Sequence, residues 1–204
     1  MTLVTRPPLP IPTEGTLTIG RRILLAWPKP EEFDCITELR NRPQVRRFFL
    51  DPRPIDAAVN REWLATGMRR GEEGLLSIRW VRSDAFLGTI GWTDWDRCLK
   101  TACFGRLMVD HHALRRLYKK VDPSYPGVAL DAAMSLRDYA FDEMALKGMT
   151  TWYFEGNTLA ARVNAAIGMV PLGLRSRLRP DGSSIRTVEL RLTRRQWSRC
   201  YKHP

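Results

Sequence analysis

Apolar residues recur along this chain with two different spacings, which separates the expected helices from the expected strands. Between Leu130 and Met144 they recur mostly every three or four residues, the spacing of an amphipathic helix. Elsewhere strand-like patterns predominate, in which apolar and polar positions alternate. Strands are expected over Leu17–Trp27, Leu75–Val81, Ala85–Trp95, Thr101–Val109 and Thr150–Glu155.

Turn and helix-start residues join these segments. Pro30 fits a helix N-terminus, where its missing N–H costs nothing, and Asn157 opens another expected helix. Asp110–Lys120 fits either a helical turn or a basic loop. The turn signal Arg179–Ser183 predicts a terminal hairpin, whose strands are expected over Leu172–Leu178 and Ile185–Leu192.

The length of 204 residues suits one well-buried domain and is too short for two ordinary ones. Prolines at positions 7, 8, 10 and 12 predict an extended arm over residues 1–15, because proline cannot donate a backbone hydrogen bond. The domain is therefore expected over residues 16–204.

The chain is strongly basic, with 33 Lys and Arg against 22 Asp and Glu, a net charge of +11 and a pI of about 10.1. Such a field favours polyanionic partners, among them RNA, an anionic membrane or a nucleotide-bearing substrate. An arginine-rich enzyme with no such partner is the alternative. Charge alone does not decide between the two readings.

Cysteine and histidine spacing predicts no metal site. The four cysteines include no Cys-x-x-Cys pair, and the three histidines lack zinc-finger spacing. We expect reduced, mostly buried thiols, with Cys103 as a structural residue. No apolar run reaches the roughly 18 residues that a membrane span requires, so we expect no membrane partner and a cytoplasmic location.

The stretch Ser124–Ala129 precedes the long amphipathic helix. Gly127 lets the backbone approach a ligand closely, and a glycine turn at a helix start directs free N–H groups and the positive dipole end at one point. This geometry suits a phosphate group. The alternative is an ordinary helix start with a glycine required only for packing, which would give the same sequence pattern.

The order and spacing of several motifs resemble the GNAT superfamily of N-acyltransferases, in particular its ribosomal-protein and nucleotide-amino-sugar acetyltransferase branches. The segment Arg40–Arg46, with Glu62–Leu64, is similar to the acceptor-side helices of the amino-sugar branch. Phe86–Gly91 and Phe104–Val109 look like the central strands. The ribosomal-protein pattern is matched by Asn157, Ala160, Arg162, Asn164, Gly168 and Met169.

The resemblance implies an α/β (α+β) fold, a single GNAT-like domain with a mixed sheet of six to seven strands and about four helices. It also implies acyl-CoA, most often acetyl-CoA, as the donor. The implied donor-binding residues are Leu107, Met108, Val109, Ser124, Gly127, Val128, Ala129 and Asn157. Ser124 departs from the family, which has Gln or Arg there, and the connection before it is longer than usual.

Catalysis needs a base for the amine and an acid for the leaving thiolate. Glu155, Asp94 and His111 are the candidate bases, with Asp110 and His112 as further options. Asn164 stands where many relatives have an acidic tyrosine, and it can donate a hydrogen bond but cannot release a proton. Tyr118, Tyr125 or water would then protonate the thiolate, or the reaction relies mainly on proximity.

The acceptor side is expected to be basic and aromatic. Its candidate acceptor- or anion-binding residues are Arg40, Arg46, Arg47, Trp63 and Trp92. Ordinary packing of the two tryptophans and a solvated arginine face are the alternatives.

Three functions follow from these expectations. The first is acyl transfer from acyl-CoA to a primary amine of a nucleotide-linked amino sugar, a small molecule or a protein N-terminus. The net charge and the Arg115–Lys120 run favour a related transferase whose donor is aminoacyl-tRNA. The missing tyrosine favours a GNAT-fold binding protein without catalysis. A monomer and a homodimer are both compatible with the sequence.

Overall fold

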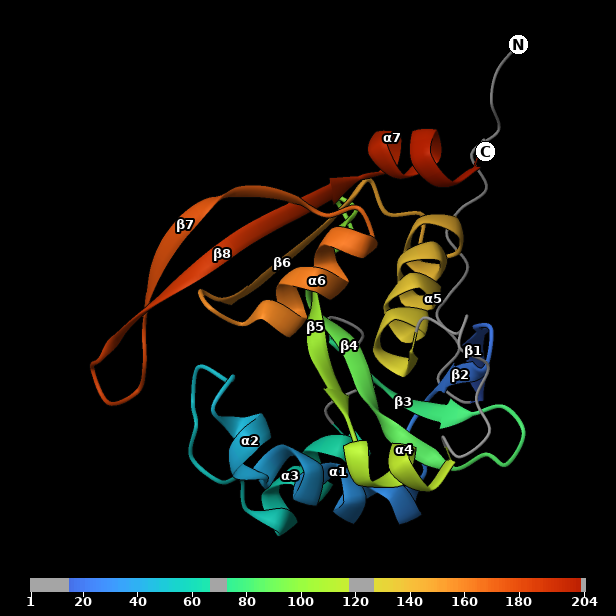
Figure 1. Cartoon of the computed structure of the whole chain (residues 1–204), viewed down its shortest axis with the longest axis vertical. Helices are drawn as coiled ribbons and strands as arrows, with labels where there is room; N and C mark the ends of the chain where they lie inside the picture. Colours follow the sequence, from blue (N-terminus) through green and yellow to red (C-terminus); the bar gives the residue numbers. More distant parts are fainter. Residues whose placement is uncertain (1–14, 67–72, 118–126, 203–204) are drawn as a thin grey trace.

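The computed structural model describes residues 15–66, 73–117 and 127–202, and its centre is one mixed sheet of eight strands (Figure 1). The spatial order is β1-β2-β3-β4-β5-β6-β8-β7, antiparallel throughout except for the parallel pair β5 and β6. The strands are β1 (Thr16–Ile19), β2 (Ile23–Ala26), β3 (Gly74–Trp80), β4 (Phe86–Asp96), β5 (Thr101–Val109), β6 (Gly148–Phe154), β7 (Val170–Leu178) and β8 (Ser184–Thr193).

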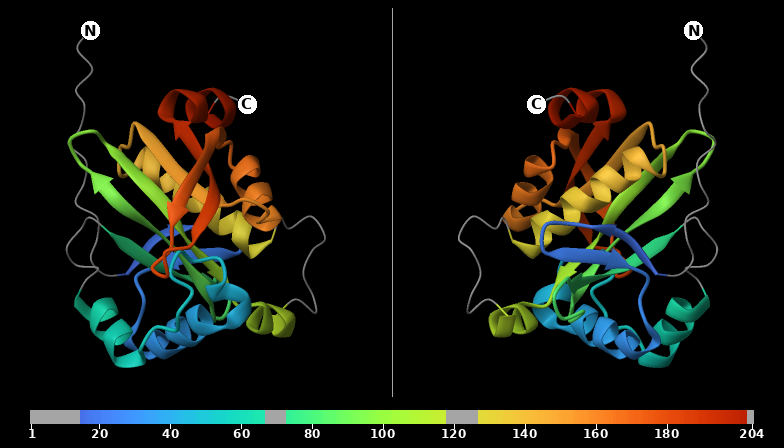
Figure 2. Two further views of the ribbon diagram at one scale, coloured as in Figure 1. Left: turned by 90° about the vertical axis from the view of Figure 1, so that its left-hand side faces the viewer. Right: turned by 90° about the vertical axis from the view of Figure 1, so that its right-hand side faces the viewer.

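Helices cover both faces of this sheet (Figures 1 and 2). Those of the described segments are α1 (Phe33–Asn41), α2 (Pro43–Arg46), α3 (Ala57–Thr66), α4 (His111–Leu117), α5 (Val128–Asp142), α6 (Thr158–Ala166) and α7 (Arg194–Trp197), with short turns at Pro30–Glu32 and Ser198–Lys202. Helix α5 packs into the main core, where Ala132, Leu136 and Ala140 are almost fully buried. Helices α1 and α3 cover the other face through a second cluster around Ile36 and Leu64.

The predicted fold class is confirmed, and the predicted strands over residues 75–81, 85–95 and 101–109 correspond to β3, β4 and β5. The terminal hairpin is confirmed as β7 and β8. The sheet has one or two strands more than expected, and several helices of one or two turns raise the helix number above about four. The proline-rich arm predicted over residues 1–15 falls, except for Gly15, outside the described residues.

The single strand expected over Leu17–Trp27 is wrong, because a tight turn divides it into β1 and β2. Asp131 on α5 holds this turn: its two carboxylate oxygens accept the backbone N–H groups of Arg21 and Arg22, each at 2.9 Å. A Cβ on Gly20 would lie 2.3 Å from the Asp131 carboxylate, so only glycine fits beside it. A residue 110 positions away therefore breaks the strand pattern.

Strands β5 and β6 separate soon after they meet. They pair in register only over Thr101–Cys103 and Gly148–Thr150. The next contact is a side-chain bond, from Thr151 Oγ1 to the Phe104 carbonyl at 2.7 Å, and beyond it the two strands diverge (Figure 1). Arg106, with φ of 55°, forms a bulge in β5 at this point. The sheet therefore contains a V-shaped opening between two parallel strands.

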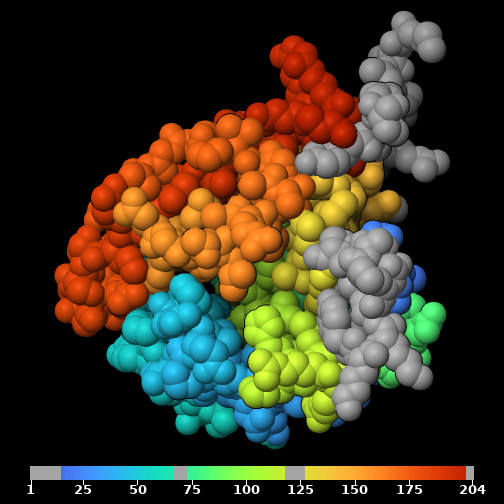
Figure 3. All heavy atoms as spheres, viewed as in Figure 1, coloured from blue at the N-terminus to red at the C-terminus, as the bar shows by residue number. Residues whose placement is uncertain are grey.

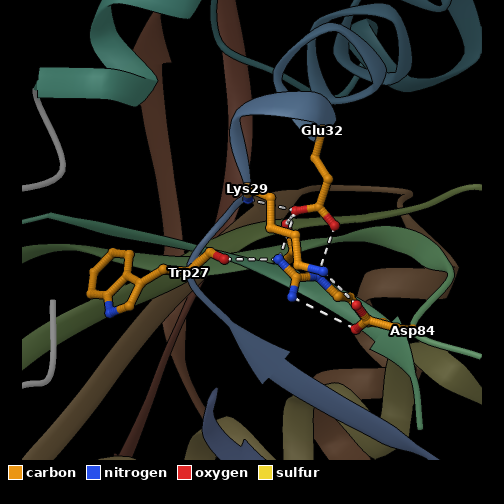
Figure 4. A network of polar contacts seen from close by, with 6 residues as sticks. Trp27, Lys29, Glu32 and Asp84 are labelled. Atoms are coloured by element: carbon orange, nitrogen blue, oxygen red, sulfur yellow. Dashed lines mark hydrogen bonds and ion pairs between the residues drawn. The ribbon is translucent and has the colours of Figure 1, made fainter. Parts of the chain in front are cut away.

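A buried polar network joins the start of α1 to β3 (Figure 4). Arg79 donates to both carboxylate oxygens of Glu32, at 2.7 and 2.9 Å, and both side chains are more than nine-tenths buried. Ser77 Oγ and the Lys29 backbone N–H also donate to Glu32, at 2.7 and 2.8 Å. Asp84, in the β3–β4 turn, accepts from Lys29 and lies 3.7 Å from Arg79. This network fixes the start of α1 against the sheet.

Across the described segments, every helix is too short or too polar to cross a membrane.

Candidate active site

The N-terminus of α5 has the geometry of an anion site. Gly127 is the N-cap of this helix, with φ of 95° and ψ of 155°, a conformation essentially restricted to glycine. As the N-cap, Gly127 offers no side-chain hydrogen bond to the helix start. The first helical hydrogen bond runs from the Asp131 N–H to the Gly127 carbonyl, at 3.0 Å. The N–H groups of Val128, Ala129 and Leu130 therefore have no partner within the helix and point along its positive end.

Among the described residues, no strand pairs with the β6-facing edge of β5 beyond Phe104. The Asp110 N–H donates to the Leu87 carbonyl on β4 at 2.7 Å, so residue 110 faces β4. Because successive residues of a strand face opposite edges, we infer that the backbone groups of Val109 and Leu107 point into the V-shaped opening, whereas those of Met108 face β4. In Figure 3, green atoms of β4 and β5 lie at the floor of a recess between α6 and α4.

A hollow of about 410 Å³ lies where β5 and β6 part. Trp92 and Phe104 belong to the core beneath α5, and Cys103 is paired with Thr93, so alternation puts Cys103 on the opposite face of the sheet. The hollow opens on that opposite face. Its walls include Asp94, Asp96, Cys103, Trp152, Arg177 and Glu189. A second hollow, of about 500 Å³ between α1 and α3, includes none of these residues.

Of the four predicted catalytic residues, the hollow contains Asp94 alone. Asp94 is exposed, with φ of 53°, and accepts from Thr93 Oγ1 at 2.8 Å. Glu155 follows the far end of β6 and pairs with Arg186 at 3.2 Å. His111 is exposed at the first position of α4, and Asn164 is half-buried on α6. Asp96, two residues from Asp94, also lines the hollow, and the spacing of the two acids was its sequence signal.

The predicted donor-binding residues fall in three places. Leu107, Met108 and Val109 lie along the V-shaped opening, and Gly127, Val128 and Ala129 form the start of α5. Asn157 caps α6, and its side-chain oxygen accepts the Ala160 N–H at 3.1 Å. Ser124, Tyr118 and Tyr125 lie outside the described residues.

Two of the predicted acceptor-side arginines support their own loop. Arg40 donates to the Asp51 carbonyl at 2.7 Å, and Arg46 donates to the Pro52 carbonyl at 3.0 Å. Arg40 is only 7% exposed and lies 3.6 Å above the Phe49 ring. These bonds hold the segment between α2 and α3, which leaves Arg40 little surface for a substrate.

The other three acceptor-side residues are placed differently from one another. Arg47 is exposed, with its guanidinium 4.6 Å above Phe48. Trp63 is half-buried on α3 beneath Arg106, whose guanidinium lies 4.8 Å from the ring centre. Trp92 is 1% exposed and packs edge-on against Trp27 in the core, so the structure excludes it from any acceptor surface.

Asp110 has a structural role. Its carboxylate accepts from both Arg42 terminal nitrogens, at 2.8 and 3.1 Å, and from the backbone N–H groups of His112 and Ala113. The Arg42 contacts lower the Asp110 pKa to about 2. A carboxylate with such a pKa is a poor proton acceptor at neutral pH. Asp110 therefore joins the α1–α2 connection to the start of α4.

Asp110→Asn is expected to remove an acid-sensitive part of the folding free energy. The pKa of Asp110 is lowered by folding, so its contribution is full above pH 5 and declines as the pH falls from about 4 to 2. Since both partners keep some solvent contact, we expect a difference of about 1–2 kcal/mol at pH 7. Asparagine still caps α4. Urea unfolding of both proteins at pH 7 and pH 3 measures the difference in unfolding free energy between wild type and variant. An equal difference at both pH values would contradict this role.

Cys103 lies in the hollow but is poorly suited to covalent catalysis. Burial raises the pKa of its thiol, and the nearby Asp94 carboxylate raises it further. The thiolate is the reactive form of cysteine, and it is disfavoured here at neutral pH. The expectation of a structural thiol agrees with this environment. The expectation of mostly buried thiols is wrong, because Cys35, Cys98 and Cys200 are exposed.

The open helix start and the two parting parallel strands agree with the fold of GNAT N-acyltransferases, and the comparison with known families shows that class directly. Residues 22–170 match the family model described as an acetyltransferase (GNAT) domain, and the chain belongs to this family. No curated protein matches the chain.

Solved structures show the same fold at low sequence identity. A probable GNAT-family acetyltransferase from Chromobacterium violaceum has a TM-score of 0.75 at 14% identity, with 97% of this chain and 96% of that chain covered. Spermidine N-acetyltransferase from Vibrio cholerae, in complex with CoA and spermine, has a TM-score of 0.71 at 13% identity, with 86% of this chain and 98% of that chain covered. The microcin C7 self-immunity acetyltransferase MccE, in complex with acetyl-CoA and AMP, has a TM-score of 0.67 at 12% identity, with 85% of this chain and 93% of that chain covered.

Proposed function

We propose that the protein transfers an acyl group, acetyl in the simplest case, from acyl-CoA to a primary amine of a small molecule. One arrangement carries the proposal: β5 and β6 part beside a hollow that contains two carboxylates, and the start of α5 has N–H groups without a partner in the helix. Two structural neighbours were solved with CoA or acetyl-CoA bound, which supports this choice of donor.

The residues fit such a donor. The N–H groups of Val128, Ala129 and Leu130 would hold its diphosphate, because a helix start favours anions. The open-edge backbone groups of Leu107 and Val109 would pair with the amides of its pantetheine arm. When bound, acyl-CoA supplies an activated thioester. With its anionic end at α5, the acyl end reaches toward the apex of the opening.

The acceptor amine would approach from the hollow. Its nitrogen attacks the acyl carbon, the C–N bond forms, the C–S bond breaks, and the amine proton must leave. Asp94 and Asp96 line the hollow and can attract the ammonium group and accept that proton, directly or through water. A backbone N–H of the open β5 edge can stabilise the developing oxyanion, and one such donor is typically worth about 3–4 kcal/mol. The released thiolate takes a proton from water.

Ligand-dependent stability and product formation together test this function. CoA is expected to raise the melting temperature, since a ligand at 100 times its Kd stabilises the folded state by about 2.7 kcal/mol. Acetyl-CoA with an amine panel is expected to yield N-acetyl product. A protein that ignores CoA but binds tRNA with steep salt dependence would instead support the aminoacyl-tRNA donor. Binding of CoA with no product from any amine would support a binding protein.

A further inference from the structure

The hairpin of β7 and β8 carries a row of arginines on the face of the sheet that holds the hollow. Arg175, Arg177 and Arg179 occupy alternate positions, so their side chains share one face. Arg177 lines the hollow beside Trp152 and Glu189, which fixes that face as the side of the hollow. The hairpin also bends toward the segment that links α2 and α3 (Figures 1 and 2).

Two of these arginines lie over aromatic rings of β6. The Arg177 guanidinium lies 4.4 Å from the centre of the Trp152 ring, and that of Arg179 lies 5.3 Å from the Phe154 ring. The two rings stack on each other, with centres 5.9 Å apart. A guanidinium placed on an aromatic face loses little further freedom when it binds an anion, because its plane is already oriented.

The positive charge of this row is only partly neutralised. Arg177 pairs with Glu189 at 2.7 Å, whereas Arg175 and Arg179 form no ion pair within the described segments. The Nε atoms of Arg177 and Arg179 are buried and have no hydrogen-bond partner there. Asp181, the acid near Arg179, already accepts from the Ser183 N–H and hydroxyl, at 2.9 and 2.6 Å. These bonds lower the pKa of Asp181 more than the charge of Arg179 does.

Acids and arginines stand at different sides of the hollow. Asp94 and Asp96 line the β4 side, whereas Arg177 and its partner Glu189 line the opposite side, and Arg179 lies farther along the hairpin, over Phe154. A polyamine would place one ammonium group near the two acids and a second near the arginines, where like charges repel. A molecule with an amine at one end and an oxyanion at the other would match both sides.

We propose that Arg177 and Arg179 bind an anionic group, phosphate or carboxylate, of the acceptor amine. This inference rests on the proposed function and adds the class of acceptor, an amine that carries an oxyanion in place of a polyamine. Planar guanidinium groups match the oxygens of both anions with paired hydrogen bonds. Arg179 makes the larger contribution, because Glu189 does not compete for it.

The test compares Arg179→Met with Arg186→Met. Both variants remove one arginine from the same hairpin. Arg186 pairs with Ser176 in the register of β7 and β8 and therefore lies on the opposite face from Arg175 and Arg177, which makes it a matched control. Arg179→Lys keeps the charge but not the planar group. Phosphoethanolamine, β-alanine, ethanolamine and spermidine are titrated against each protein with CoA at saturation, which fills the anion site at α5.

Wild-type protein is expected to bind phosphoethanolamine or β-alanine at least tenfold more tightly than ethanolamine or spermidine. The preferred probe of these two identifies the anion as phosphate or carboxylate. Arg179→Met is expected to lose this preference at least tenfold, Arg179→Lys to lose less, and Arg186→Met to keep it. In acetyl transfer the same loss should fall on KM for the preferred anionic probe.

Tighter binding of spermidine, equal losses in the Arg179 and Arg186 variants, or no binding of either anionic probe would overturn the inference. Failure of the proposed function has a different signature, since CoA would then leave the melting curve unchanged. In that case the anionic probes are titrated without CoA, and their dependence on Arg179 still decides the inference.

Discussion

Gly127→Ala is expected to weaken the binding of CoA by about tenfold to a hundredfold. The φ of 95° at Gly127 is available to alanine only with strain, typically 1–3 kcal/mol. Relief of that strain requires the backbone before α5 to rotate, which turns the Val128 and Ala129 N–H groups away from a bound diphosphate. Since each 1.4 kcal/mol corresponds to a factor of ten, the strain alone accounts for this range. Calorimetric titration with CoA measures the change.

The matched control is Gly182→Ala in the β7–β8 turn. Gly182 has φ of 81°, and a Cβ there would meet no atom within 4 Å, so this variant imposes the strain of a positive φ without a steric clash. Both variants should lose stability in urea unfolding, while Gly182→Ala binds CoA normally. Unchanged CoA affinity in Gly127→Ala would remove the donor site from the start of α5.

The regular elements could be predicted because their signals are local. Strand β5 was predicted with the bounds Thr101–Val109 that the structure has, since alternation runs through its whole length. The turn that separates β1 from β2 could not be predicted in this way. It depends on Asp131, which folding brings to Gly20–Arg22 from 110 residues away.

The two halves of the candidate site differ in the same respect. The donor side consists of one helix start and one strand, so Gly127 and Val109 could be named from consecutive residues. The acceptor side draws Trp152, Arg177 and Glu189 from three strands, and β8 lies between β6 and β7 in space. A hairpin signal in the sequence does not say which of its strands joins the sheet, so this group was missed.

Two predicted acceptor-side residues are wrong because residue type alone does not show which face of the sheet a side chain occupies. Arginine and tryptophan often line anion and aromatic sites, and the prediction of Arg40 and Trp92 rests on residue type alone. Strand β4 puts Trp92 on its core face, beside Ile90 of the same cluster, and Arg40 uses its donor group on the Asp51 carbonyl. Neither assignment follows from spacing along the chain. Both depend on which face of the sheet the helices occupy.

Arg79→Met is expected to cost 3–5 kcal/mol of folding free energy, the usual cost of leaving one charge of a buried pair without its partner. Glu32 would remain more than nine-tenths buried as a carboxylate, with only Ser77 and the Lys29 N–H as donors. Because the Glu32–Arg79 pair fixes the start of α1, urea unfolding at pH 7 should report this loss as a lower midpoint.

Two further variants separate the buried charge from simple loss of a contact. Arg61→Met removes an exposed ion pair with Asp34, and pairs of this kind are typically worth about 0.2–1 kcal/mol. Glu32→Gln combined with Arg79→Met removes both charges but keeps an acceptor for Ser77 and Lys29, so the double variant should be more stable than Arg79→Met alone. A double variant as unstable as the single one would mean that the lost hydrogen bonds, and not the uncompensated carboxylate, dominate the energy of this network.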